Sequence, residues 1–319
     1  HCDTLGGAYR NPEEFNLFAN DSQIDFQKMQ QGDYMAQFFA MFLPPRAQAK
    51  ERGHELPPDN EMIHTMQSTL IREIGKHSDM IGFARNYTDL MTNSKAGKMS
   101  AFLTIEDGRP VEGSFENLQH YYDMGVRLIS FTWNYANCFG FPNSLDAAVM
   151  NKGLTKFGCE AVEWMNEKGM LVDVSHLSDG GFFDVARLSK KPFVASHSNC
   201  RALSGHQRNL TDEMIPLLAK AGGVSGINFC SNFLSEDISS KDSLVSDMVR
   251  HIKHFVKLGG IECVGLGSDF DGITSKLEVK DASMMQIIFE ALSKAGFSEG
   301  QIEKIAYGNV LRVINEVLK

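Results

Sequence analysis

The chain has 319 residues, of which 43% are hydrophobic and 22% charged, and its formal net charge is −9 with a pI of about 5.6. This length and apolar content suit one large α/β domain with a buried core, so we expect a single domain over residues 1–319. An acidic chain without a basic run argues against nucleic acid and anionic membranes as partners. It has no apolar run of 18 residues, so the sequence also predicts no membrane span.

The cysteines do not form C-x-x-C pairs and lack the pattern of a disulfide framework. We expect buried free thiols, which favours a reducing, cytoplasmic compartment. The chain begins with histidine rather than methionine, so we expect upstream residues, and a secreted or periplasmic form stays an alternative. The six cysteines are Cys2, Cys138, Cys159, Cys200, Cys230 and Cys263.

Short apolar runs recur along the chain, and most are followed by a stretch with helical periodicity. Seven runs have the composition of buried strands: residues 34–43, 101–107, 126–134, 170–176, 191–198, 222–230 and 261–271. The segment that leads into His1 makes an eighth, and its first part would lie before residue 1. The clearest helices are expected at residues 153–168, 178–189, 242–257 and 284–295. Gly169 would end the first of these helices, and Ser178 is a suitable N-cap for the second.

This alternation predicts a parallel sheet covered on both faces. Eight strand–helix units indicate a closed (β/α)8 barrel, the TIM barrel found in many metal-dependent hydrolases. An open doubly wound sheet is the structural alternative. It is disfavoured because no G-x-G-x-x-G turn follows any of the runs.

Ionisable side chains stand where the apolar runs end, and in a barrel these ends meet at the rim that carries catalysis. His1 and Asp3 would point to the same side of a strand. Taken singly, each residue has an ordinary explanation as a hydrogen-bonded histidine, a helix cap or a turn. Together they form a set of three histidines, two aspartates and one glutamate from five runs: His1, Asp3, Glu106, His176, His197 and Asp269.

Such a set carries a desolvation cost unless its members are paired or bind a cation. Imidazole and carboxylate together suit Zn²⁺ or a similar divalent ion. Five ligands exceed one tetrahedral site, so the sequence predicts two ions that share a carboxylate and activate water between them. The H-x-x-H pair of His251 and His254 is weaker evidence for a metal, and we expect these two residues to be solvated or half-buried.

Seven segments match the order and spacing of one known family. They are "HCDT" (1–4), "LTIEDG" (103–108), "DVSHLS" (173–178), "SHSNCRAL" (196–203), "RNLTDEMI" (208–215), "GLGSDFDG" (265–272) and "YGNVLRV" (307–313). In these segments the chain resembles the membrane (renal) dipeptidases and their bacterial relatives in the amidohydrolase superfamily. The resemblance implies a (β/α)8 barrel with two zinc ions per chain. It also implies a homodimer that hydrolyses dipeptides, including some with a D-residue at the C-terminal position.

The resemblance also implies roles for individual residues. His1 and Asp3 resemble the ligands of one zinc, His176 and His197 those of the other, and Glu106 the bridge between them. Asp269 resembles the acid/base that handles the proton of the attacking water. Arg208 falls where the family binds the α-carboxylate of the substrate, and a planar guanidinium suits that carboxylate.

Two positions depart from the family pattern. Trp133 stands where relatives carry a histidine that contacts the substrate carbonyl, and an indole N–H can donate a hydrogen bond but cannot titrate. We therefore expect Trp133 and Asn134 to contact the substrate. Asp107 stands where relatives often have glycine. Two other functions stay open: a different amidohydrolase reaction on a lactone, phosphoester or deaminase substrate, or a metal-binding barrel with weak or no catalysis.

Overall fold

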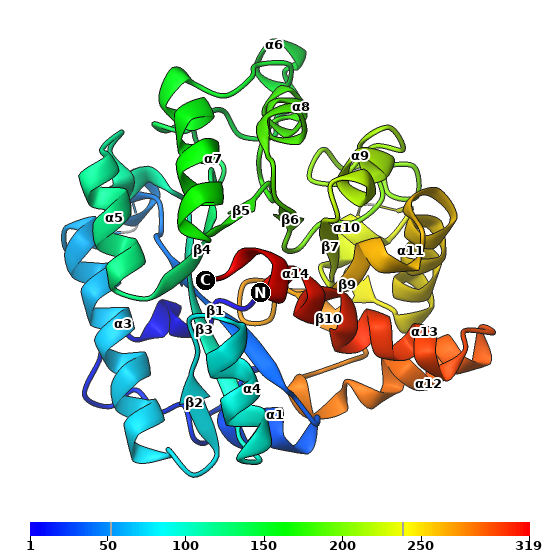
Figure 1. Cartoon of the computed structure of the whole chain (residues 1–319), viewed down its shortest axis with the longest axis horizontal. Coiled ribbons are helices and arrows are strands. Elements are labelled where there is room, and N and C mark those ends of the chain that lie inside the picture. Colours follow the sequence, from blue (N-terminus) through cyan, green and yellow to red (C-terminus); the bar gives the residue numbers. More distant parts are fainter. Residues whose placement is uncertain (52, 238) are drawn as a thin grey trace.

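The computed structural model describes residues 1–51, 53–237 and 239–319. At its centre, parallel strands curl into a ring with helices outside it (Figure 1). The ring follows the order β1, β3, β4, β5, β6, β7 and β9, and β2 pairs with the start of β3. The strands of this sheet are β1 (Ala36–Phe42), β2 (Ile81–Phe83), β3 (Met99–Glu106), β4 (Val126–Ser130), β5 (Leu171–Asp173), β6 (Val194–Ala195), β7 (Val224–Asn228) and β9 (Val264–Ser268).

Cys2 takes the eighth position of the ring, between β9 and β1. It forms parallel bridges with Phe39 on one side and Phe270 on the other. The Ala40 N–H donates to the Cys2 carbonyl at 3.0 Å. On the other side, the Asp3 N–H donates to the Phe270 carbonyl at 2.9 Å. The predicted (β/α)8 barrel is therefore confirmed, and the residues around Cys2 occupy one of its eight strand positions.

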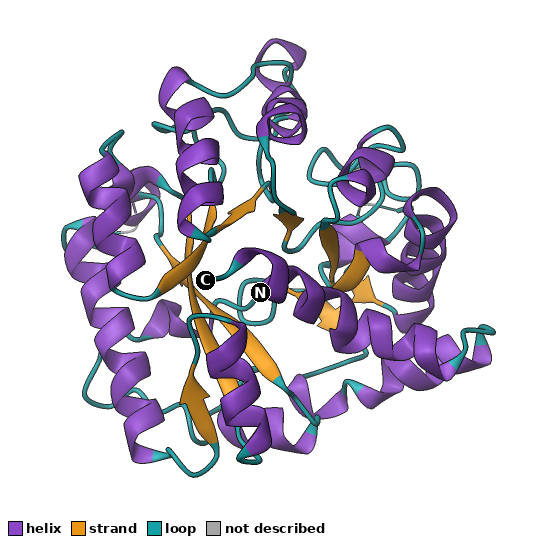
Figure 2. Ribbon diagram, in the orientation of Figure 1, coloured by secondary structure: helices purple, strands orange, loops and turns teal. Residues whose placement is uncertain are grey.

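The helices form an outer layer around the strands (Figure 2). A separate small sheet pairs β8 (Asp242–Ser243) with β10 (Lys276–Leu277). The helices are α1 (Phe26–Gln31), α2 (Arg46–Glu51), α3 (Asp59–Lys76), α4 (Tyr87–Lys95), α5 (Phe115–Asp123), α6 (Ala147–Met150), α7 (Lys156–Lys168), α8 (Asp179–Leu188), α9 (Met214–Lys220), α10 (Ser231–Leu234), α11 (Val245–Gly259), α12 (Gln286–Lys294), α13 (Glu299–Glu303) and α14 (Asn309–Val317).

All seven predicted runs contain a strand of the ring, and the four predicted helices correspond to α7, α8, α11 and α12. The Ser178 side chain caps α8 by accepting from the Gly181 N–H, and Gly169 ends α7 in the left-handed conformation, both as expected. The short strand β2 was missed. Its sequence, IGF, is too short to show a period, and it forms only by pairing with β3.

The last helix closes the end of the barrel opposite the predicted site. In Figure 1, α14 crosses the middle of the ring. Its Val313, Ile314 and Val317 pack against apolar side chains of five strands, three of which are the first residues of their strands. Those side chains are Phe102, Leu128, Leu171, Val194 and Val224. The carboxyl ends of the strands are consequently the open end, where barrel enzymes place their chemistry.

The six cysteines are free thiols, as the sequence predicts, but only three of them are fully buried. None of the described helices is both long enough and apolar enough to cross a membrane. A cavity of about 1090 Å³ lies between the early residues of β1, including Ala36 and Phe38, and Leu266 of β9. The expected strand upstream of His1, and the single-domain organisation, stay predictions.

His251 on α11 is 0% exposed, and its ring links three segments of the chain. Its Nδ1 accepts from the Cys200 N–H at 3.0 Å, and its Nε2 donates to the Leu234 carbonyl at 2.9 Å. The expected solvated or half-buried position is therefore wrong for His251, because it faces the interior of an amphipathic helix. The expectation holds for His254, which is half-buried beside Asp212. Burial lowers the pKa of His251 to about 4.

We expect His251 to destabilise the fold in acid. Its pKa in the unfolded chain is about 6.5, so the unfolded state binds more protons between pH 6.5 and 4. The free energy of unfolding should fall by about 3 kcal/mol across this window on account of this one residue. In His251→Asn, an oxygen can still accept from Cys200 but cannot titrate. Urea unfolding at pH 7 and 4.5 should therefore show a smaller acid loss in His251→Asn than in the wild type. An equal acid loss in His251→Asn and the wild type would contradict the prediction.

Candidate active site

The structure brings all six predicted ionisable residues to the open end of the barrel. His1 and Asp3 flank Cys2, and Glu106 is the last residue of β3. The other three stand just beyond the ends of β5, β6 and β9: His176, His197 and Asp269. Because parallel strands end at the same rim, residues up to 268 positions apart in sequence converge on one centre.

Four of these residues form a first pocket around the His1 ring. Its Nε2 lies 3.5 Å from Asp3 Oδ1, 3.6 Å from Glu106 Oε2 and 3.7 Å from Asp269 Oδ1. His1 Nε2 and Asp3 Oδ1 are buried, and neither has a hydrogen-bond partner among the described residues. Buried polar atoms left without partners are costly, so this arrangement fits a cation among them.

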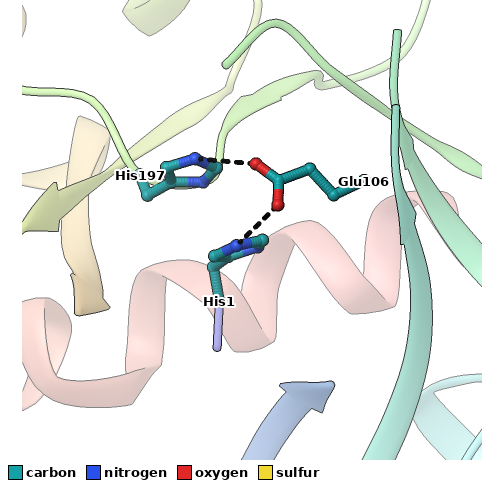
Figure 3. A group of neighbouring side chains, drawn as sticks. All are labelled: His1, Glu106 and His197. Carbon is teal, nitrogen blue, oxygen red and sulfur yellow. Dashed lines mark ion pairs between the residues drawn. The ribbon is translucent and has the colours of Figure 1, made fainter. Parts of the chain in front are cut away.

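A second pocket lies at the other carboxylate oxygen of Glu106, Oε1. His176 Nε2 is 2.9 Å from Glu106 Oε1, and His197 Nε2 is 3.5 Å from the same oxygen. The two imidazole nitrogens are 3.0 Å apart. Figure 3 shows Glu106 beside the stacked rings of His1 and His197, with one carboxylate oxygen directed to each ring. A carboxylate placed in this way can bridge two ions.

Burial sets the charge of these groups. It lowers the pKa of His176 and of His197 well below the usual range, so both rings are neutral, which is the form that binds metals. Burial raises the pKa of Glu106, and the charge of Asp3 raises it further. Burial opposes the charged form of His1, but the charges of Glu106 and Asp3 outweigh it and raise its pKa. Carboxylates held so closely stabilise positive charge between them, which suits divalent ions such as Zn²⁺.

The backbone is strained at two of the site residues. His176 has a φ of 69° and Asp269 a φ of 67°, in the left-handed region that residues with a Cβ rarely adopt. Gly272 follows in the same loop, and a Cβ there would collide with the carboxylates of Asp3 and Asp269. Such strain is typical of functional sites, because it costs stability and persists only where the surroundings hold it.

Hydrogen bonds behind the pockets orient three of the side chains. His176 Nδ1 lies 3.2 Å from Asn134 Oδ1, and His197 Nδ1 lies 2.8 Å from Ser196 Oγ. The Asn228 amide donates to Asp269 Oδ2 at 2.8 Å. Ser196 and Asn228 were missed from the sequence, although both are polar residues at the ends of apolar runs. Asn134, which the sequence predicts to contact the substrate, is placed by the structure against His176 and orients its ring.

Arg208 is buried beside the second pocket, with 6% of its surface exposed. Its guanidinium makes two long contacts of 3.3 Å, to Ser198 Oγ and the His197 carbonyl. Its Nε has no hydrogen-bond partner among the described residues. Burial lowers the pKa of this guanidinium. A buried arginine with so few partners is suited to bind an anion that enters the site.

Trp133 forms an aromatic wall next to the second pocket. Its ring centroid lies 6.1 Å from that of His176 and 5.1 Å from that of Phe42. The exposed Tyr135 continues this wall at 6.1 Å from Trp133. Asp107 lies behind the rim, where it accepts from Arg109 Nη1 and Asn137 Nδ2 at 3.1 and 2.9 Å.

The chain matches the sequence model of the membrane dipeptidase family, peptidase family M19, over residues 1–319. It is 37% identical over 270 residues to an "uncharacterized protein in pqqA 5′ region" from Klebsiella pneumoniae, covering 82% of this chain and 98% of that protein. A solved structure described as the dipeptidase AC, a metallo peptidase, superposes with a TM-score of 0.89 at 26% identity, over 100% of this chain and 97% of that one.

A second solved structure is a metallo peptidase from Rhodobacter sphaeroides, liganded with a phosphinate mimic of the dipeptide L-Ala-D-Ala. It superposes with a TM-score of 0.88 at 26% identity, over 99% of this chain and 97% of that one. The family match spans the whole chain, and both structures share its complete barrel. The chain therefore belongs to the membrane dipeptidase family and is a metallo-dipeptidase, a hydrolase that acts on peptide bonds.

Proposed function

We propose that this protein is a dipeptidase with two zinc ions per chain, and that its substrates include dipeptides with a D-residue at the C-terminal position. The observation that carries the proposal is the position of Glu106, which offers one oxygen to each of two pockets. Arg208 lies beside these pockets, and its Nε has no hydrogen-bond partner among the described residues, which favours a substrate with a free carboxylate. The structural relative with a bound L-Ala-D-Ala mimic supports the D-residue.

The two ions would have different ligands. His1 and Asp3 would hold one, His176 and His197 the other, and Glu106 would bridge them. When bound, the ions supply a water molecule of lowered pKa and polarise the peptide carbonyl. The remaining roles belong to side chains of the chain itself.

Arg208 binds the C-terminal carboxylate of the dipeptide, and this contact places the peptide bond over Glu106. Asp269 takes a proton from the attacking water and delivers it to the leaving amine nitrogen. Its Oδ1 faces His1, while the Asn228 amide holds its Oδ2 in place. Trp133 and Asn134 line the pocket for the substrate, with the indole N–H as a donor to the carbonyl region.

The oligomeric state and the compartment are also part of the proposal. The resemblance implies a homodimer, which light scattering of the purified protein would check. The six free thiols favour a cytoplasmic location.

Metal content is the first prediction of this proposal. Purified protein loaded with Zn²⁺ should hold about two ions per chain by elemental analysis, because two pockets share one carboxylate. It should cleave L-L and L-D dipeptides and lose this activity with a chelator. A parallel panel of lactones and phosphoesters should not be cleaved. The absence of bound metal after zinc loading would contradict the proposal. Two bound ions with cleavage of lactones or phosphoesters, but of no dipeptide, would indicate a different reaction.

Asp269→Asn should lower kcat by at least about 100-fold, because a positioned acid/base contributes about 10²–10⁴-fold. The amide keeps the size of the side chain and can still accept from Asn228. Metal content should stay close to two ions per chain, which separates proton transfer from metal binding. Full turnover in this variant would exclude the acid/base role, and loss of one ion would make Asp269 a ligand of the first pocket.

Arg208→Met should lower kcat/KM for a free dipeptide by about 100-fold, because a bidentate ion pair with the carboxylate is lost. The same variant should act on the corresponding dipeptide amide as the wild type does. Arg201→Met is the matched control, since Arg201 lies in the same loop but already pairs with Asp179 at 2.7 Å. An equal loss on both substrates would show that Arg208 acts on the fold rather than on the carboxylate.

A further inference from the structure

Asp173 is the last residue of β5, and it is 0% exposed. Its Oδ1 accepts from the backbone N–H groups of Ser175 and Ser196 at 3.0 and 2.8 Å. Its Oδ2 accepts from the hydroxyls of Ser130 and Ser196 at 2.5 and 2.6 Å. A buried carboxylate is thus surrounded by four donors, none of which belongs to a pocket ligand.

One of these donors connects Asp173 to the metal centre. Ser196 Oγ lies 2.6 Å from Asp173 Oδ2 and 2.8 Å from His197 Nδ1. An ionised carboxylate can only accept, and a hydroxyl has one hydrogen. Ser196 Oγ also lies 3.3 Å from Ser175 Oγ, but its contact with the carboxylate is much shorter, so Ser196 gives its hydrogen to Asp173 and accepts from His197. The direction of these two hydrogen bonds places the ring proton of His197 on Nδ1.

The position of that proton matters on the opposite side of the ring. His197 Nε2 is the atom that faces Glu106 and His176, at 3.5 and 3.0 Å. With the proton on Nδ1, Nε2 carries a lone pair and can bind a cation. With the proton on Nε2, the ring would instead donate a hydrogen bond across the pocket, and the cation would have lost a ligand.

We propose that Asp173 is a positioning residue that acts through Ser196 to hold His197 in its Nδ1–H form, and so sets the cation affinity of the pocket made by His176, His197 and Glu106. This inference rests on the proposed metal function and deepens it. Among the described residues, Asp173 hydrogen-bonds to none of His1, Asp3 or Asp269, so its effect is confined to one of the two pockets.

A structural role would look different. Asp173 lies opposite Ser130 of β4 and Val194 of β6 in the sheet register, so it also ties three strands together. Loss of that tie would lower the melting temperature and affect both pockets alike. Selective loss of one ion, with a change of tautomer at one ring, is expected only if the hydrogen bonds through Ser196 set the tautomer of His197.

Asp173→Asn is the main test. It reverses the direction of the hydrogen bonds that link residue 173, Ser196 and His197, and it does not change the size of the side chain. Two backbone N–H groups hold the amide oxygen at the Oδ1 position, so the amide NH₂ faces Ser196. Ser196 then accepts from Asn and donates to His197 Nδ1, which moves the ring proton to Nε2. We expect Zn²⁺ affinity to fall about 10–100-fold at one site and to be unchanged at the other.

Three further variants sharpen this test. Ser196→Ala removes the link and should weaken the same site, by less than Asp173→Asn does, because nothing then forces the wrong tautomer. Ser196→Thr keeps a hydroxyl and should restore binding. Ser130→Ala is the matched control, since it removes a hydrogen bond to the same Asp173 oxygen without touching His197. It should bind both ions as the wild type does.

Two measurements are needed on each folded variant. Titration with Zn²⁺ or Co²⁺ gives the affinity of each site, and ¹⁵N spectra of histidine-labelled, metal-free protein give the tautomer of His197, assigned with His197→Gln. The tautomer measurement does not depend on dipeptide cleavage, so it separates this inference from a failure of the proposed function. The inference is overturned if His197 stays in the Nδ1–H form in Asp173→Asn, or if Ser130→Ala loses the same ion. If Asp173→Asn does not fold, the comparison of Ser196→Ala with Ser196→Thr decides.

Discussion

The Glu106 carboxylate is 2% exposed, and three imidazole nitrogens lie 2.9 to 3.6 Å from its two oxygens. A buried charge in this position is tolerable only with counter-charge on both sides. Among the neighbours, His1 can carry positive charge, but burial keeps His176 and His197 neutral, and Asp3 and Asp269 add further negative charge. The site therefore requires further positive charge, which a bound divalent cation would supply.

The barrel brings these residues together through its closure. Cys2 is bridged to both Phe39 and Phe270, so the segment that carries His1 and Asp3 is held between β1 and β9. Glu106 ends β3, which is buried along all eight of its residues and is paired with β1 over seven. The opposite end of the barrel is filled by α14. Glu106, a proposed ligand, therefore stands on a buried and paired strand, and the strained backbone at His176 and Asp269 lies at the rim of the same barrel.

The barrel and the six convergent residues were predictable because they depend on local patterns: an apolar run gives a strand, and a polar residue after it lies at the rim. The supporting residues were not predictable in this way. Ser196 and Asn228 matter because of partners 23 and 41 positions away, and no spacing rule connects them. The burial of His251 depends likewise on contacts with Cys200 and Leu234. Strand β2 depends on β3, since three residues have no period of their own.

Some of the proposed ligands stand on the paired strands themselves, whereas the proposed substrate contacts do not. Glu106 is the last residue of β3, and His1 and Asp3 flank the bridged Cys2, whereas Trp133 and Arg208 belong to the loops that follow β4 and β6. Loops accept substitutions and insertions far more readily than packed strands do. Over evolutionary time, such a chain can exchange the side chains that select a substrate while its hydrolytic chemistry is inherited unchanged. A different side chain at position 133 would change which small peptides are preferred, so relatives that share one reaction could differ in substrate preference at this position.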